Sequence, residues 1–192
     1  MHTGQPTLIL ASKSPRRREI LRAAGFAFAV RAAEVEEARR DNETPQDYVR
    51  RLAVEKANAV EAGVNEVVLA ADTVVLAGEQ LLEKPTSAGD ARRMLATLSG
   101  RPHEVLTGVC LRTATRMMVD QALTRVWLSP LSAGEVEEYV QSGEPMDKAG
   151  GYAIQGLASK YVERVEGCYF NVVGLPVSMV YRLWKQIIAA GL

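Results

Sequence analysis

The order of hydrophobic and polar residues in this 192-residue chain changes period several times, which predicts alternating strands and helices. Short apolar runs without polar residues between them are typical of strands that are buried on both faces. Apolar residues three or four positions apart are instead typical of a helix that packs on one side. On these grounds, strands are predicted at residues 8–11, 26–32, 67–76, 103–112, 117–127, 161–165 and 169–173.

Four helices are predicted to begin after a hydroxyl residue that can accept a hydrogen bond from the first turn. These N-cap residues are Ser14, Thr44, Ser87 and Ser132. A fifth helix is predicted at residues 175–190 from its apolar positions, and residues 142–156, rich in Gly, Asp and Pro, are predicted as a loop. Because strands and helices alternate without an internal repeat or a linker, the pattern predicts one α/β domain over residues 1–192, with room for two lobes.

The charge balance excludes some classes of protein. The chain has 23 Lys and Arg residues together and 23 Asp and Glu residues together, so the formal net charge is zero. A sequence-independent nucleic-acid binder or a polybasic membrane-surface protein would carry a basic excess, so neither partner is expected. No apolar run approaches the roughly 18 residues of a membrane span. Residues 1–7 carry no signal-peptide pattern, so the two cysteines, Cys110 and Cys168, are interpreted as buried intracellular thiols.

Cations crowd the start of the first predicted helix, just after Ser12. The N-terminal end of a helix is the positive end of its dipole, so each cation there is unfavourable by about 0.3–1 kcal/mol. A bound anion would reverse this, because it can accept hydrogen bonds from the backbone and from guanidinium groups. Arg16 and Arg17 are therefore predicted to bind an anion, with solvated surface arginines as the alternative. Arg18 is expected to be a solvated surface residue.

A carboxylate and a lysine stand in apolar surroundings. Asp72 lies inside the strand predicted at residues 67–76, where an ionised carboxylate is costly unless it is paired or holds a metal. We interpret it as a catalytic or metal-binding residue, with a structural hydrogen bond as the alternative. Lys56 falls on the apolar face of the helix that begins after Thr44. Taken alone, it is more simply interpreted as a lysine whose charged end reaches solvent.

The remaining candidates are cations and carboxylates. Lys84 and Lys148 lie in predicted loops beside strand ends, where an ammonium group can bind phosphate or can simply be solvated. Only two histidines exist, which excludes a histidine-rich zinc site, and His103 is predicted to begin a strand and make a local hydrogen bond. No Walker-type or dinucleotide-binding glycine loop is present. The set suits a metal-assisted attack on a polyphosphate. Further carboxylates that could join Asp72 are Glu34, Glu36 and Glu37.

Several segments, in order along nearly the whole chain, resemble the Maf family of nucleoside triphosphate pyrophosphatases. The most specific are residues 10–17, with the sequence LASKSPRR, and residues 143–152, with the sequence GEPMDKAGGY. Other similar segments are residues 71–75, 83–85, 98–103, 154–156 and 171–176.

The resemblance implies hydrolysis between the α and β phosphates of a nucleoside triphosphate, giving the monophosphate and pyrophosphate. It also implies a divalent cation (Mg²⁺ or Mn²⁺), a cytoplasmic location and often a homodimer. The implied fold is a two-lobed α/β domain, with a central mixed sheet flanked by helices and a cleft between the lobes. By resemblance, Asp72 is the general base and, with Glu37, a metal ligand. The implied substrate-binding residues, expected to converge in the cleft, are Ser12, Arg16, Arg17, Glu37, Lys56, Thr73, Lys84, Lys148 and Gln155.

Two residues also indicate a branch of the family. A branch similar to 7-methyl-GTP pyrophosphatases has an aromatic residue at the position of Arg16 and Glu at the position of Gln155, so this chain resembles the dTTP/UTP branch. A neutral amide offers both a donor and an acceptor, which matches a pyrimidine edge. The alternative function is a non-catalytic nucleotide-binding regulator of cell division, because the family is associated with septum formation.

Overall fold

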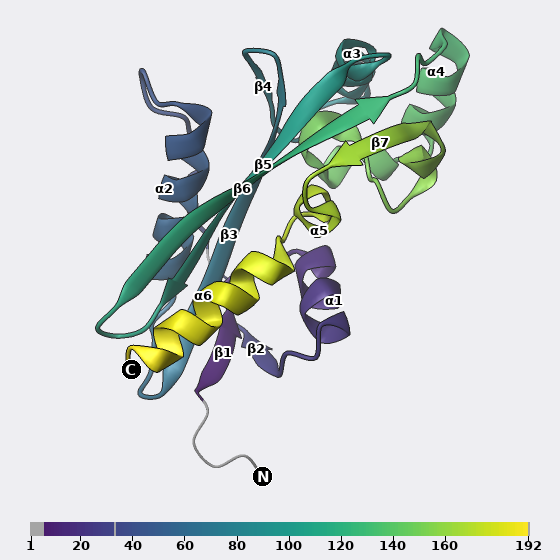
Figure 1. Ribbon diagram of the computed structural model, residues 1–192. Helices are drawn as coiled ribbons and strands as arrows, with labels where there is room; N and C mark the ends of the chain where they lie inside the picture. The colour runs from purple at the N-terminus through teal and green to yellow at the C-terminus, as the bar shows by residue number, and fades with distance from the viewer. Residues whose placement is uncertain (1–5, 33, 192) are drawn as a thin grey trace. The chain divides into compact units, whose positions relative to one another are not determined.

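The computed structural model describes residues 6–32 and 34–191 (Figure 1). The N-terminal segment in which no signal peptide is expected therefore lies largely outside the described residues. The chain forms two compact units. Unit 1 comprises Met1–Asp72, Thr107–Ala122 and Gly174–Leu192, and unit 2 comprises Thr73–Leu106 and Leu123–Val173.

The described strands form one mixed sheet in the order β2-β1-β3-β5-β6-β7, with β4 paired to β3. The strands are β1 Thr7–Leu10, β2 Phe28–Val30, β3 Glu66–Ala77, β4 Gln80–Leu82, β5 Pro102–Arg112, β6 Met117–Leu128 and β7 Val162–Glu166. The α-helices are α1 Pro15–Ala23, α2 Pro45–Asn58, α3 Ala88–Leu98, α4 Ala133–Gln141, α5 Tyr169–Val173 and α6 Val177–Ala189. Three 3₁₀ helices are η1 Glu144–Asp147, η2 Ala149–Gly151 and η3 Leu157–Tyr161.

In unit 1, β1 lies between β2 and β3 and pairs with both in parallel. Helix α2 packs on this layer through small side chains, since Ala53 and Ala57 are buried in one cluster with Ile9 and Val68. The backbone of α2 also approaches β5 closely. A Cβ atom at Gly108 would lie 2.2 Å from the carbonyl oxygen of Val49, so only glycine fits there.

In unit 2, α3 and α4 pack against each other, and the 3₁₀ helices η1 and η2 contact both α3 and each other. Strand β4 pairs with the end of β3 and β7 pairs with β6, both antiparallel. Helices η1 and η2 lie within the loop predicted at residues 142–156, which therefore contains short helical turns.

Local hydrogen bonds begin the helices as predicted. Each of the four predicted N-cap side chains accepts a hydrogen bond from the backbone N–H three residues further on. Ser132 and Glu135 form a complete capping box at the start of α4. The predicted α/β fold with a central mixed sheet and helices is confirmed, whereas the cleft between lobes and the single domain stay predictions.

The strand predicted at residues 169–173 is wrong, because these residues form helix α5. Tyr, Phe and Val favour strands, but the buried side chain of Asn171 decides the local conformation. Its amide donates hydrogen bonds to the carbonyl oxygen of Val105 at 2.9 Å and to Oγ1 of Thr124 at 3.0 Å. Strand β4 and helix η3 were not predicted.

The two cysteines differ in how deeply they are buried. Cys110 is buried as predicted, and burial raises the pKa of its thiol to about 12. Cys168 is only partly buried, so the prediction of two buried thiols is wrong for this residue. Among the described residues, no helix has the length and apolar character that crossing a membrane requires.

Candidate active site

A lysine and two carboxylates meet in unit 1. The ammonium Nζ of Lys56 lies 2.5 Å from Oδ1 of Asp72 and 2.6 Å from Oε1 of Glu37. The Asp72 side chain is 9% exposed and that of Lys56 is 11% exposed, whereas Glu37 is 45% exposed. The buried Asp72 charge is therefore balanced by a buried cation, and Glu37 connects the pair to solvent.

The position of each partner follows from its element. Asp72 comes from β3, whose neighbouring residues are almost all buried, and Lys56 comes from the last turn of α2. Because both lie in apolar surroundings, each charge needs the other. The prediction that the charged end of Lys56 reaches solvent is wrong, since its ammonium group is bound between carboxylates. Glu37 is placed by its backbone, since its carbonyl oxygen accepts a hydrogen bond from the hydroxyl of Tyr48 at 3.0 Å.

Arg17 and Ser12 form the second part of the cluster. Nη1 of Arg17 donates to Oγ of Ser12 at 3.3 Å, and its Nε donates to the carbonyl oxygen of Gly174 at 2.8 Å. Burial lowers the pKa of Arg17, and the negative charges of Asp72 and Glu37 oppose that shift. An arginine remains protonated in proteins, so two cations and two carboxylates interact electrostatically here.

The other cations at the start of α1 have different surroundings. Lys13 is exposed and forms an ion pair with Glu34. Arg18 donates weakly to the carbonyl oxygen of Lys13, at 3.4 Å, and Arg16 is partly buried next to Arg17. Of the three glutamates that could join Asp72, Glu37 is therefore the one whose carboxylate reaches the Lys56 ammonium, while Glu34 is bound elsewhere.

The donor set of the cluster is suitable for a divalent cation. Mg²⁺ usually binds one or two carboxylates and completes its shell with water and substrate phosphates. Asp72 and Glu37 supply two such carboxylates around one point, the Lys56 ammonium. The described residues contain no group of three or more His, Cys, Asp and Glu that could hold a metal by themselves.

The remaining predicted site residues belong to unit 2. Thr73 follows Asp72 in β3 and is partly buried, while Lys84 is exposed just after β4. Nζ of Lys148 donates to the carbonyl oxygen of Glu144 at 2.7 Å and forms an ion pair with Asp147 at 2.5 Å. Gln155 is exposed in a turn that precedes η3.

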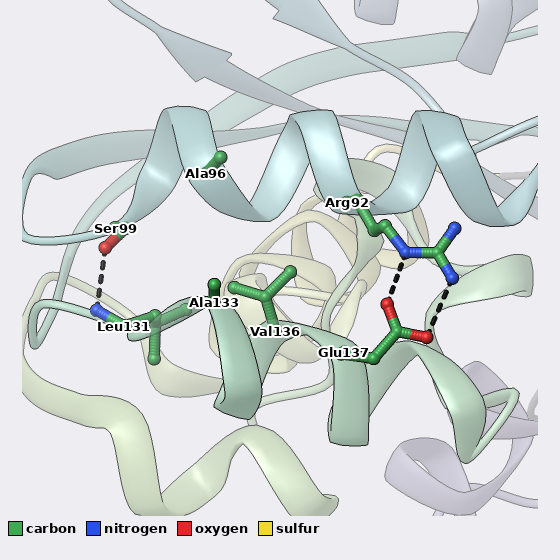
Figure 2. Close-up of a pocket in the computed structure, with 7 residues that line it drawn as sticks. All are labelled: Arg92, Ala96, Ser99, Leu131, Ala133, Val136 and Glu137. Carbon is green, nitrogen blue, oxygen red and sulfur yellow. Dashed lines mark hydrogen bonds and ion pairs between the residues drawn. The ribbon is translucent and has the colours of Figure 1, made fainter.

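A pocket of about 490 Å³ in unit 2 lies between α3 and α4. Figure 2 shows Arg92 on one helix and Glu137 on the other, joined by two hydrogen bonds of 2.6 and 2.9 Å. The rest of its lining is Ala96, Ser99, Leu131, Ala133 and Val136. None of the predicted site residues lines this pocket, and its two charged groups already neutralise each other, so the Asp72 cluster is the better candidate for chemistry.

Comparison with known proteins assigns the chain to a family. The family profile described as "Maf-like protein" matches residues 7–187. The chain belongs to the Maf family. A protein of Koribacter versatilis named dTTP/UTP pyrophosphatase is 49% identical over 180 residues, which are 93% of each chain. A relative of the same name from Anaeromyxobacter dehalogenans is 51% identical over 185 residues, which are 94% of each chain.

One solved structure outside these Maf relatives is also similar. It is the nucleoside-triphosphatase, or dITP/XTP pyrophosphatase, of Mycobacterium abscessus, with a TM-score of 0.41 and 15% identity. The likeness covers 66% of this chain and 76% of that chain, and it is too weak to assign a function.

Two residues of this Maf protein support the cluster without having been predicted as part of it. The hydroxyl of Tyr48 donates a hydrogen bond to the Glu37 backbone, and Tyr48 is completely buried on α2. In the sequence pattern, Tyr48 cannot be distinguished from the other apolar positions of this helix. The carbonyl oxygen of Gly174 binds Arg17 from 157 residues away. A backbone acceptor has no side-chain signature, so pattern analysis of one sequence could not find it.

Proposed function

We propose that this protein hydrolyses the α–β phosphoanhydride of dTTP and UTP, giving the nucleoside monophosphate and pyrophosphate. The proposal is supported by family membership, by relatives named dTTP/UTP pyrophosphatase at 49–51% identity, and by the Asp72 cluster. The observation on which it chiefly depends is the buried Asp72 carboxylate bound by Lys56 next to Arg17. Carboxylates and cations are the groups that such a reaction needs.

Each residue of the cluster has a proposed role. Asp72 accepts a proton from the water that attacks the α-phosphorus, and pyrophosphate is the leaving group. The guanidinium of Arg17 and the ammonium of Lys56 bind phosphate oxygens and compensate the charge that develops on them. Substrate binding by Ser12, Arg16, Thr73, Lys84, Lys148 and Gln155 is part of the same proposal.

We further propose that Asp72 and Glu37 hold a divalent cation, Mg²⁺ or Mn²⁺, when the triphosphate is bound. Bound there, the ion would neutralise phosphate charge and polarise the scissile bond. The triphosphate itself brings about four negative charges, so its phosphates can take over the Lys56 ammonium from the two carboxylates. Lys56 then remains paired whether the ion is present or absent.

The nucleobase preference is proposed from Gln155 and Arg16. The amide of Gln155 can donate to a carbonyl oxygen and accept from the N3–H group of uracil or thymine. We propose that these two side chains favour pyrimidine triphosphates over 7-methyl-GTP.

The test is a panel of nucleoside triphosphates with Mg²⁺ and Mn²⁺, scored for monophosphate and pyrophosphate. We expect the wild-type protein to release pyrophosphate from dTTP and UTP, and Asp72→Asn to reduce turnover by about 10²–10⁴-fold, the usual contribution of a positioned base. The matched control is Asp41→Asn, at an exposed turn position outside the cluster.

Circular dichroism and thermal unfolding would show whether Asp72→Asn is folded. Normal dTTP hydrolysis by folded Asp72→Asn would contradict the role of Asp72. Absence of pyrophosphate release by the wild-type protein with every triphosphate and both metals would contradict the proposed activity itself.

A further inference from the structure

Two side chains of unit 2 hold the turn that carries Gln155. The hydroxyl of Tyr139, in α4, accepts a hydrogen bond from the backbone N–H of Ala153 at 3.0 Å. The same hydroxyl donates to Oε1 of Glu144 at 2.7 Å, and Oε2 of Glu144 accepts from the N–H of Leu157 at 3.2 Å. The turn is therefore bound on both sides of Gln155, two residues before it and two residues after it.

The carboxylate of Glu144 lies directly against the turn. A Cβ atom at Gly156 would be 2.2 Å from Oε2 of Glu144, so any larger residue at position 156 would displace the carboxylate. The φ angle of Gly156 is −103°, outside the left-handed region that favours glycine. The close approach of the Glu144 carboxylate therefore limits the size of the residue next to Gln155.

Glu144 also contacts a second candidate substrate residue. Its backbone carbonyl accepts the hydrogen bond from Nζ of Lys148. Its side chain binds the Gln155 turn, as described above. One residue therefore sets the positions of a lysine assigned to the phosphates and an amide assigned to the base.

The hydroxyl of Tyr139 can connect Glu144 to the turn because it both donates and accepts a hydrogen bond. Tyr139 is 3% exposed, and burial together with the hydrogen bond to Glu144 raises the pKa of its hydroxyl. It therefore stays protonated near neutral pH, so it donates to Glu144 and uses a lone pair to accept from the N–H of Ala153.

We propose that Tyr139 and Glu144 are positioning residues for nucleobase selection, which act by fixing the turn that presents Gln155. This rests on the proposed function, because it requires Gln155 to contact the base. Uracil presents the N3–H donor beside an acceptor oxygen, whereas cytosine presents the N3 acceptor beside an amino donor. A primary amide can satisfy either pattern by turning over, so it distinguishes the two bases only when its position is fixed.

The experiment measures kcat/KM for UTP and for CTP and compares their ratio among variants. Tyr139→Phe removes only the hydroxyl, and Gly156→Ala displaces the Glu144 carboxylate without changing either positioning residue. We expect each to lower the UTP:CTP ratio by about tenfold, the factor that the net contribution of one hydrogen bond corresponds to. In a Gln155→Ala background, Tyr139→Phe should not lower the ratio further.

Matched controls separate positioning from general damage. Tyr181→Phe changes an exposed tyrosine of α6, and Gly134→Ala adds a methyl group to open space in α4. Both should keep the wild-type ratio. A fall in kcat/KM of the same size for UTP and CTP in Tyr139→Phe would show a merely structural role and overturn the proposal. An additional tenfold loss of the ratio in the Gln155→Ala background would also overturn it.

The wild-type measurements distinguish this proposal from the proposed function. If the wild-type protein hydrolyses UTP and CTP equally well, the positioning proposal fails and the pyrophosphatase activity stands. If it hydrolyses no triphosphate, both fail, and that result is known before any variant is made.

Discussion

Replacement of Lys56 by methionine tests the electrostatics of the candidate active site most directly. The substitution keeps a long side chain on the apolar face of α2 but removes the ammonium that lies 2.5 Å from Asp72 and 2.6 Å from Glu37. At an effective dielectric constant of about 20, opposite charges about 3 Å apart attract by about 5–6 kcal/mol before solvation is counted.

The net loss of stability is smaller than this attraction. Glu37 is 45% exposed, so water screens its part of the interaction, and Arg17 continues to oppose the Asp72 charge. Breaking a buried ion pair by removing one partner usually costs about 3–5 kcal/mol. We therefore expect Lys56→Met to lower the free energy of unfolding by about 3 kcal/mol in buffer without divalent cations.

Urea denaturation at pH 7, with and without Mg²⁺, measures both the loss of stability and the stabilisation by the cation. Without Lys56, a cation that competes with Mg²⁺ for the two carboxylates is removed, so Mg²⁺ should stabilise Lys56→Met more than the wild-type protein. Lys185→Met, on the exposed side of α6, is the matched control. If Lys56→Met were as stable as Lys185→Met, the ion pairs would contribute nothing. Equal stabilisation of Lys56→Met and wild type by Mg²⁺ would refute the assignment of these carboxylates to the metal.

Two further predictions concern stability. Gly108→Ala should lower the free energy of unfolding by about 2 kcal/mol or more, because the new methyl group would press on the Val49 carbonyl. In the control Gly89→Ala, the new methyl group has ordinary contacts, so stability should change little. Equal Tm values for the two variants in thermal unfolding would show that the close approach at Gly108 is unimportant. Burial lowers the pKa of His103 to about 4, so the unfolded chain takes up a proton below about pH 6.5 while the folded chain does not until about pH 4. Stability should therefore fall by up to about 3 kcal/mol as the pH drops from 6.5 to 4, and a similar fall in His103→Gln, measured by urea denaturation, would contradict this cause.

The sequence predicted best those features that depend on neighbours along the chain. Helix starts at Ser14, Thr44, Ser87 and Ser132 follow from a side chain and an N–H group three residues apart, so a short window contains the whole interaction. The buried strand around Asp72 was likewise evident from its apolar run.

Features that depend on distant partners could not be predicted in the same way. The Lys56 ammonium lies between Asp72 and Glu37 and not in solvent, and both carboxylates belong to other segments of the chain. The conformation of residues 169–173 is decided by hydrogen bonds from Asn171 to residues 47 and 66 positions away, and these override the strand preference of its neighbours. His103 likewise makes its side-chain hydrogen bond, of 2.7 Å, with Tyr152, 49 residues further along the chain.

The hydrogen bond from Arg17 to the carbonyl of Gly174 has a consequence for synthesis of the protein on the ribosome. Unit 1 is built from three separate segments of the chain, and its last segment begins at Gly174. Arg17 therefore has no Gly174 acceptor until the ribosome has added the 157 residues that separate the two. Contacts of such long sequence separation form late and slowly. A nascent or truncated chain that lacks this segment would carry Asp72 and Lys56 but would lack the Gly174 acceptor of Arg17, so we expect anion binding to begin only once this segment is present.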